Sequence, residues 1–142
     1  MKGKFATLLG IVVFCCLLIS GAGWAADNGT VTINGLVWLK NPASCLGQMT
    51  WSQAMGGVSS FASGGCSNLS DGSKAGQWRL PTKDELIQVQ SKINALGSVR
   101  SDYHWSSTEA YGTSAYIVHM GNGAVSTFPK TAQEYTMPVR QP

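Results

Sequence analysis

The pattern of hydrophobic and polar positions divides the chain into an apolar leader and a longer mixed part. The leader is Phe5–Ile19, an uninterrupted apolar stretch preceded by Lys2 and Lys4 and followed by the small residues Ser20–Gly23 and then by Trp24-Ala25. Its apolar core is shorter than the roughly 20 residues that a membrane-spanning helix needs. A positive start, an apolar core and a small-residue cleavage site predict a signal peptide over residues 1–25 and no permanent membrane anchor.

The mature part, residues 26–142, begins and ends with patterns typical of β-strands. Asn34-Gly35, two residues that tolerate positive φ, predict a tight turn between two short apolar runs. The last third has short runs rich in aromatic and β-branched residues, separated by glycine and asparagine. Strands are therefore expected at Val31–Ile33, Leu36–Leu39, Tyr103–Ser107, Tyr116–Met120, Ala124–Phe128 and Tyr135–Arg140.

Two segments between these strands have the periodicity of helices. Each segment begins with the spacing of a capping box, in which two side chains satisfy free amides at the start of a helix. The pairs are Thr50 with Gln53 and Thr82 with Glu85. Apolar residues then recur on one face, which predicts burial of that face. The first stripe is Trp51, Ala54, Met55, Val58 and Phe61, and the second is Leu86, Val89, Ile93 and Leu96, ended by Gly97. Helices followed by antiparallel strands indicate an α+β fold.

Only two cysteines, Cys45 and Cys66, belong to the predicted mature part. In an oxidising compartment we expect them to form a structural disulfide, which stabilises the fold by about 3 kcal/mol through a loop of about twenty residues. A metal site is disfavoured, because His104 and His119 show no ligand spacing with the cysteines. A redox role is disfavoured in the absence of a Cys-x-x-Cys sequence.

The net charge of the chain gives no support for a nucleic-acid partner. The whole sequence carries a formal charge of +3, but the predicted signal peptide contains two of its ten basic residues. The mature part is therefore almost neutral. Binding to nucleic acid usually requires a clustered basic face.

The sequence also lacks the patterns of the common catalytic and calcium sites. Its carboxylates are scattered singly, whereas calcium requires several oxygen ligands in one place. Ser106 and Ser107 lie close to His104, but neighbouring residues on a strand point to opposite faces. We therefore expect no metal, no cofactor and no enzymatic activity.

The remaining notable side chains fall into a structural set and a candidate binding set. Four tryptophans in apolar patterns are expected in the core, and Arg79 and Arg140 are expected to brace the fold through carboxylates such as Glu85. The tryptophans are Trp38, Trp51, Trp78 and Trp105. Aromatic faces and amides between Asp102 and Asn122 suit a glycan or peptide. The candidate binding residues are Tyr103, His104, Tyr111, Tyr116 and Asn122, although His104 and His119 also fit as surface or core histidines.

Four segments together resemble the bacterial Lcl C-terminal domain family, named after the end domain of a collagen-like adhesin. They are Asp27–Thr32 with Leu36–Lys40, Trp78–Leu86, Trp105–Thr108 and Val139-Arg140, which cover nearly all of the mature part. The resemblance implies a C-type-lectin-like fold, similar to the sulfatase-modifying group, with two helices packed on a twisted antiparallel sheet and the chain ends close together. Many family members have a cysteine in the first helix and another in the last strand, where this chain has Met55-Gly56 and Pro138.

The resemblance, with the absence of catalytic patterns, leads us to expect a secreted or periplasmic, non-catalytic binding module. Its partner would be a glycan or a protein at the cell surface, as in adhesion. Two alternatives stay open. One is a structural or assembly subunit of a surface complex, and the other is an enzyme on a scaffold like the sulfatase-modifying factor, which would need a metal.

Overall fold

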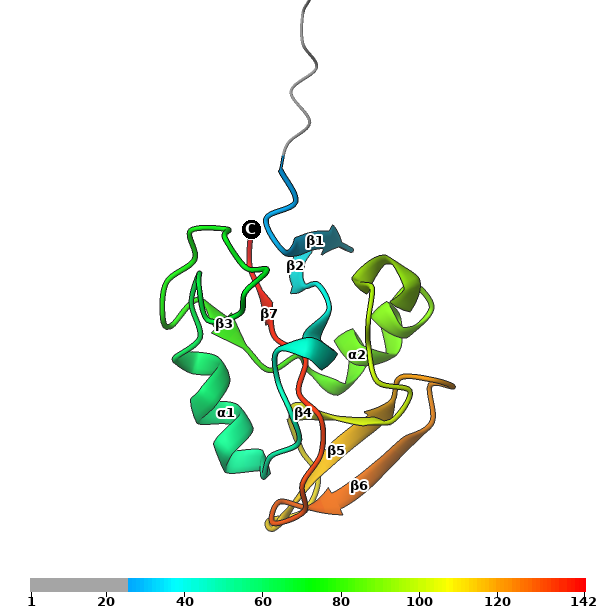
Figure 1. The fold of residues 1–142 in the computed structure, drawn as a ribbon. Coiled ribbons are helices and arrows are strands. Elements are labelled where there is room, and N and C mark those ends of the chain that lie inside the picture. The colour runs from blue at the N-terminus through cyan, green and yellow to red at the C-terminus, as the bar shows by residue number, and fades with distance from the viewer. Residues whose placement is uncertain (1–25) are drawn as a thin grey trace, which may run out of the picture.

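The computed structural model describes residues 26–142, so the predicted signal peptide lies outside the described residues. These residues form two antiparallel sheets and two α-helices, as the predicted α+β class requires (Figure 1). The first sheet has the strand order β1-β2-β7-β3, with β1 Thr30–Ile33, β2 Leu36–Leu39, β3 Trp78–Arg79 and β7 Val139–Arg140. The second sheet has the order β4-β5-β6, with β4 Tyr103–Glu109, β5 Ser114–His119 and β6 Val125–Pro129.

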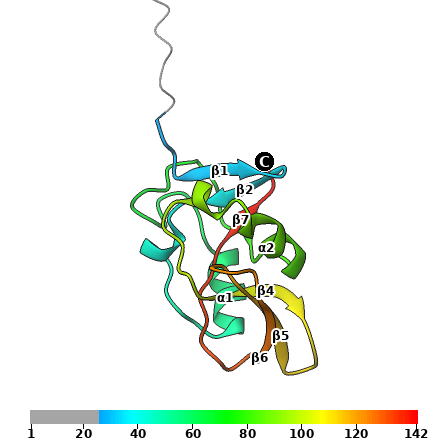
Figure 2. The same cartoon turned by 90° about the vertical axis from the view of Figure 1, so that its right-hand side faces the viewer.

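Both helices begin at the predicted capping boxes. Thr50 precedes α1 (Trp51–Ser59) and Thr82 precedes α2 (Lys83–Gln90), and in each case the threonine hydroxyl accepts a hydrogen bond from the amide three residues later. The glutamine or glutamate at that position accepts a bond from the threonine amide in return. Helix α1 packs against β3 and β4 (Figure 1), whereas α2 packs against β4 and β5 (Figure 2).

The structure differs from the expected single sheet, because the last strand is shorter than predicted. Pairing in the first sheet begins only at Val139, after Pro138, which has no amide hydrogen to donate. Before that point the backbone of Tyr135 runs parallel to β4. Its amide donates to the carbonyl oxygen of Tyr103 (3.2 Å), and its carbonyl oxygen accepts from the amide of Trp105 (2.9 Å). The segment before β7 therefore joins two separate sheets.

The second predicted helix also ends earlier than its apolar stripe. Helix α2 stops at Gln90, and a 3-10 turn, Ile93–Leu96, carries the rest of the stripe. Lys92 breaks the helix with φ −116° and ψ 19°. Leu86, Val89 and Leu96 are nevertheless buried, so the stripe still faces the core.

The tryptophans separate into a buried set and one half-buried member. Trp38, Trp78 and Trp105 have at most 2% of their surface exposed, as expected for core residues. Trp51 is only half-buried, and Met55, one turn further along α1, is 38% exposed. The first stripe of α1 is therefore narrower than predicted, and Ala54 and Val58 are its fully buried members.

A disulfide and two pairs of oppositely charged side chains link separate parts of the fold. Cys45 and Cys66 form a disulfide with their Cα atoms 5.5 Å apart. Arg79 donates from both terminal nitrogens to the two oxygens of Glu85, at 2.8 Å each. This pairing lowers the pKa of Glu85 against the opposing effect of its burial. Arg140 is held by a carboxylate as well, that of Asp71.

The ends of the described part lie close together, as the family resemblance implies. Strand β2 pairs with β1 on one side and with β7 on the other, so the first and last strands belong to one sheet (Figures 1 and 2). Within residues 26–142, no helix combines the length and the apolar character that crossing a membrane would require.

Candidate functional site

The candidate binding residues do not form one surface, because they lie at both ends of the second sheet. The β4–β5 loop, which carries Tyr111, lies at one end of β5, and the β5–β6 loop, which carries Asn122, lies at the other. Strand β5 has six residues. At about 3.3 Å per residue, its two ends are about 17 Å apart. A small ligand can therefore contact one end or the other.

The end at the β4–β5 loop presents the most exposed aromatic side chain among the large hydrophobic residues. Tyr111 is 76% exposed. Lys130 holds its loop, since Nζ donates to Oε2 of Glu109 (2.7 Å) and to the carbonyl oxygen of Gly112 (3.0 Å). The amide of Ala110 donates to the carbonyl oxygen of Ser114 (3.0 Å) across this loop, and the amide of Lys130 donates to that of Thr113 (2.8 Å), so Tyr111 projects from a braced turn.

Lys130 also links this loop to the first helix. Its Nζ lies 4.4 Å from the centre of the Trp51 ring, a favourable contact between a cation and an aromatic face. The indole nitrogen of Trp51 donates to the carbonyl oxygen of Ser106 (2.9 Å), which fixes the ring against β4. We call Tyr111, Trp51, Glu109 and Lys130 the Tyr111 surface.

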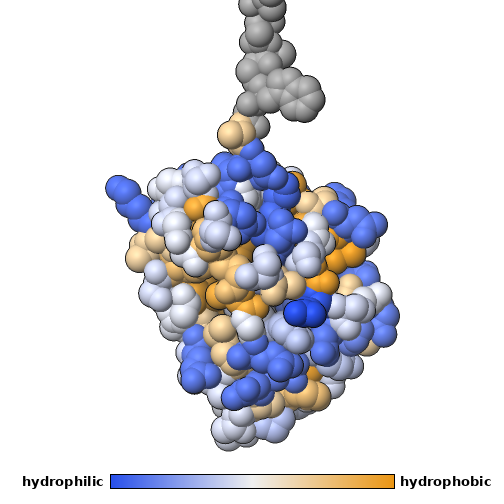
Figure 3. All heavy atoms as spheres, in the orientation of Figure 1, coloured by the Kyte–Doolittle hydropathy of each residue, from blue (hydrophilic) through white to orange (hydrophobic). Residues whose placement is uncertain are grey.

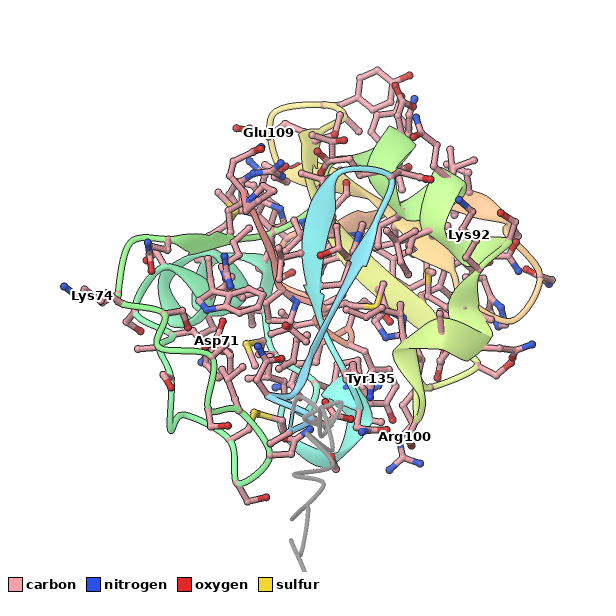
Figure 4. All side chains as sticks on the ribbon, turned by 90° about the horizontal axis from the view of Figure 1, so that it is seen from above. Asp71, Lys74, Lys92, Arg100, Glu109 and Tyr135 are labelled. Atoms are coloured by element: carbon pink, nitrogen blue, oxygen red, sulfur yellow. A yellow bond between two sulfur atoms is a disulfide. The ribbon has the colours of Figure 1, made fainter. Side chains whose placement is uncertain are left out.

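The charge of the Tyr111 surface is balanced. Lys130 and Glu109 form an ion pair whose glutamate side chain is 59% exposed. In the view from above, Glu109 lies at the rim of the molecule (Figure 4). On the face shown in Figure 3, the more apolar area lies across the middle, and hydrophilic residues lie around it. The Tyr111 surface is thus aromatic and nearly neutral, a composition that suits a polyhydroxylated or peptide ligand.

The other end of β5 holds Tyr103 and Asn122 around His119. The rings of Tyr103 and His119 meet edge to face with their centres 5.0 Å apart. Tyr103 is half-buried and also packs against Phe128, at 5.7 Å between ring centres. Asn122 is exposed, but its side-chain oxygen accepts a bond from the amide of Ala124 (2.9 Å), so it shapes the turn.

His104 lies in the interior, which corrects its place in the candidate binding set. It is 2% exposed, and its Nδ1 donates to the carbonyl oxygen of Asp102 (3.0 Å). Burial lowers the pKa of His104 to about 4, so the ring is neutral at neutral pH. A partner in solution cannot reach this ring, which packs beside Tyr135 instead.

Tyr116 faces the second helix. It is half-buried, and Nζ of Lys83 lies 4.6 Å from the centre of its ring. The amide of Lys83 donates to the hydroxyl of Thr108 (3.0 Å), so α2 begins against the last residues of β4. Tyr116 is therefore a contact between α2 and the sheet, at the margin of any docking surface.

Glu134 is the one acidic group of the described residues whose pKa rises strongly. It is 8% exposed, and burial together with the nearby charge of Asp102 raises its pKa to about 7. Its backbone pairs in both directions with Met49, which holds the chain before β7 in place. The charge state of Glu134 therefore makes the stability of the fold depend on pH.

Residues 26–142 enclose no pocket, and they contain no cluster of three or more histidine, cysteine, aspartate or glutamate side chains placed for a metal. Ser106, one of the serines considered as a nucleophile, is fully buried. Its hydroxyl donates to the carbonyl oxygen of Tyr116 (2.7 Å) and accepts from the amide of Thr108 (3.2 Å).

Solved structures share this arrangement of helices and sheets. One is the structure of the Yersinia pseudotuberculosis adhesin InvE, with a TM-score of 0.51 and 13% identity over 78% of this chain. The match spans 33% of the InvE chain, so this chain corresponds to about a third of that protein. Another is botrocetin, with a TM-score of 0.51 and 12% identity over 80% of this chain and 97% of botrocetin. At sequence identities this low, the structural likeness establishes the fold class alone, an α+β fold that this chain shares with these proteins.

The family is defined by the sequence itself. The model of the Lcl C-terminal domain matches residues 29–140, and the chain belongs to this family. A comparison with curated proteins finds no match. The matched range agrees with the described fold, from the residue before β1 to the end of β7.

Sequence reasoning missed three members of the Tyr111 surface. Trp51 was assigned to the core on its helical spacing, and Glu109 and Lys130 had no local pattern to mark them. The two charged residues are 21 positions apart, and only the pairing of β5 with β6 brings them together. Two features of the sequence could have indicated that Trp51 is partly exposed. It lies in the first turn of α1, and Gly56-Gly57 narrow the apolar face of that helix.

Proposed function

We propose that this protein is a non-catalytic binding module of C-type-lectin-like fold that recognises a glycan or a protein at the bacterial cell surface. The observation that carries the proposal is Tyr111, an aromatic side chain that is 76% exposed on a loop braced by Lys130. Exposed aromatic side chains on rigid supports are favoured in binding sites, because they supply a large contact area at a small cost in conformational entropy.

The composition of the Tyr111 surface supports a polar partner with some apolar faces. Tyr111 and Trp51 offer ring surface, and the paired Glu109 and Lys130 offer hydrogen bonds without a net charge. Sugars and peptide loops both combine apolar faces with hydroxyl or amide groups. The adhesin InvE shares the fold, and the proposed role in surface recognition is an analogy with that protein.

The disulfide supports a location outside the cytoplasm. Disulfides persist in oxidising compartments, and Cys45 and Cys66 join the segment after η1 (Pro42–Ser44) to the loop after α1. A secreted or periplasmic location therefore accounts for both the predicted signal peptide and the disulfide. N-terminal sequencing of exported protein tests the predicted cut after Ala25.

Binding experiments with the exported protein test the proposed function. The protein is applied to a glycan array and to an array of purified bacterial and host surface proteins. We expect at least one ligand to be bound, and Tyr111→Ala to weaken that binding by about tenfold, the loss of about 1.4 kcal/mol. The matched control is Ile87→Ala, because Ile87 is also an exposed apolar residue (41%) but lies on α2.

Two results would contradict the proposal. One is the absence of binding on both arrays together with turnover in an activity screen, which would favour the enzyme on the same scaffold. The other is binding that Tyr111→Ala and Ile87→Ala weaken equally, which would remove the Tyr111 surface from the site.

A further inference from the structure

Strand β6 is the outer edge of the second sheet, and its backbone is free on that side. It pairs with β5 alone, and it lies at the rim of the sheet in Figure 1. The hydrogen bonds at the two ends of this pairing fix which residues face outward. The amide of Lys130 donates to Thr113, and the amide of His119 donates to the carbonyl oxygen of Ala124, at 2.8 Å each.

Antiparallel pairing alternates between residues that exchange hydrogen bonds and residues that do not. Because Lys130 and Ala124 bond inward, the register places Ser126 and Phe128 inward as well. The amides and carbonyls of Val125 and Thr127 therefore point away from β5. Within residues 26–142, neither residue has a backbone hydrogen bond to any group outside the ladder.

We propose that the β6 edge pairs with the same edge of a second copy of this chain, antiparallel about a two-fold axis at Ser126. In this register Val125 faces Thr127 of the other copy, and Thr127 faces its Val125. Each of the two pairs exchanges two hydrogen bonds, so all four outward donors and acceptors of each strand find partners. The edge is thus complementary to itself, as a two-fold interface requires.

The side chains of β6 are compatible with this pairing. From Val125 to Pro129 the strand carries no charge, so two copies do not repel each other. Ser126, a small residue, lies at the axis. Val125 is 44% exposed, and a β-branched threonine beside it across the new strand pair would cover it. Proteins often protect edge strands with lysine, proline or a bulge, and only Pro129, at the end of β6, has that effect here.

The β1 edge of the first sheet is less suited to the same pairing. Strand β1 packs against the 3-10 turn η2 (Ile93–Leu96), and Lys92 before that turn donates to the side chain of Asn34 (2.7 Å). A lysine ammonium and a turn therefore lie beside the β1 hairpin. This contrast favours β6 as the place for a second copy, and the inference is independent of the proposed binding function.

Sedimentation equilibrium of the exported protein over a wide concentration range tests the proposal. We expect a monomer–dimer equilibrium, with Val125→Lys lowering the association constant about tenfold or more. Ile87→Lys is the matched control, because it places the same charge at an apolar position of similar exposure on α2. It is expected to leave the association constant unchanged.

Amide hydrogen exchange tests the register without any variant. The amides of Val125 and Thr127 should become protected as the concentration rises, whereas those of Ser126 and Phe128 should already be protected in the monomer. A protein that stays monomeric at millimolar concentration would overturn the proposal. So would a dimer in which the Val125 and Thr127 amides exchange as in the monomer, or a monomer whose β6 edge captures an added extended peptide.

Discussion

Arg140 and Asp71 lie 69 positions apart, and the guanidinium donates from Nε (3.1 Å) and Nη2 (3.0 Å) to one oxygen of the carboxylate. The Asp71 side chain has no exposed surface, and in Figure 4 it lies among other side chains, whereas Lys74 projects outward. Burial alone would raise the pKa of Asp71, but hydrogen bonds from Ser73 and from Arg140 outweigh it and lower the pKa. The pair ties β7 to the loop after α1.

Removing Asp71 should therefore cost more stability than removing an exposed carboxylate. Asp71→Ala leaves a guanidinium that is 16% exposed without its partner, and it also frees the hydroxyl of Ser73. We expect the free energy of unfolding in urea to fall by about 3 kcal/mol. The control is Asp84→Ala, whose side chain is 78% exposed and which should change stability by less than about 0.5 kcal/mol. Equal effects of the two variants would contradict the role of the pair.

The disulfide should account for a similar share of the stability. Cys45 and Cys66 are 21 positions apart, and closing a loop of this length removes about 3 kcal/mol of chain entropy from the unfolded state. The double variant Cys45→Ser with Cys66→Ser should unfold at a correspondingly lower urea concentration. Adding a reductant should shift the unfolding of the original protein in the same direction and leave the double variant unchanged. Two free thiols in exported, unreduced protein would contradict the pairing.

A buried hydroxyl offers a stabilising substitution. Thr136 is 1% exposed, and among the described residues its Oγ1 has no hydrogen-bond partner. Thr136→Val replaces that hydroxyl by a methyl group of similar shape, so we expect the free energy of unfolding to rise by about 1 kcal/mol. Thr82→Val is the matched control, because its hydroxyl accepts the amide of Glu85 and caps α2. It should lower stability by about 1 kcal/mol, and a loss of stability in both variants would show that Thr136 has a partner.

The raised pKa of Glu134 predicts a contribution to stability that is lost as the pH rises from 4.5 to about 7. An acid whose pKa is higher in the folded state contributes stability that is fully present below its unfolded value of 4.5. This contribution disappears as the pH rises through about 7, because the folded protein must then hold a buried charge near Asp102. Relative to the original protein, Glu134→Gln should therefore gain stability as the pH rises from 4.5 to 7. An unchanged pH profile in this variant would contradict the assignment.

His104 should act on the acid side. Its pKa is lowered to about 4 by burial, so its contribution to stability is complete above pH 6.5 and disappears as the pH falls through about 4. His104→Gln should therefore weaken the acid-induced loss of stability while lowering stability at neutral pH. Chemical denaturation at a series of pH values measures both effects. Because His104 and Glu134 act in opposite directions between pH 4 and pH 7, the original protein and a double variant with Glu134→Gln should have similarly flat profiles, whereas each single variant should have a sloping one.

Part of the candidate site was accessible to sequence reasoning. Tyr111 follows Glu109-Ala110 among small and polar residues, a composition typical of an exposed loop, and the structure places it there. His104 was misplaced because the sequence places it in a strand but does not say that Tyr135 runs along the open side of β4. Tyr111 and Asn122 were grouped because they are near in sequence, although β5 lies between them and separates their loops.

The sequence by itself determined the features that arise from contacts within a few residues. These are both capping boxes, the Asn34-Gly35 turn, the Arg79–Glu85 pair and, with only two cysteines left, the disulfide. Such features depend on backbone dihedrals and short-range hydrogen bonds, which residue type and spacing largely specify. Only the tertiary structure decided the split into two sheets, the burial of Asp71 under Arg140 and the joining of Glu109, Lys130 and Trp51. These depend on which distant segments lie side by side, and hydrophobic periodicity shows which face of a strand is buried without showing what covers it.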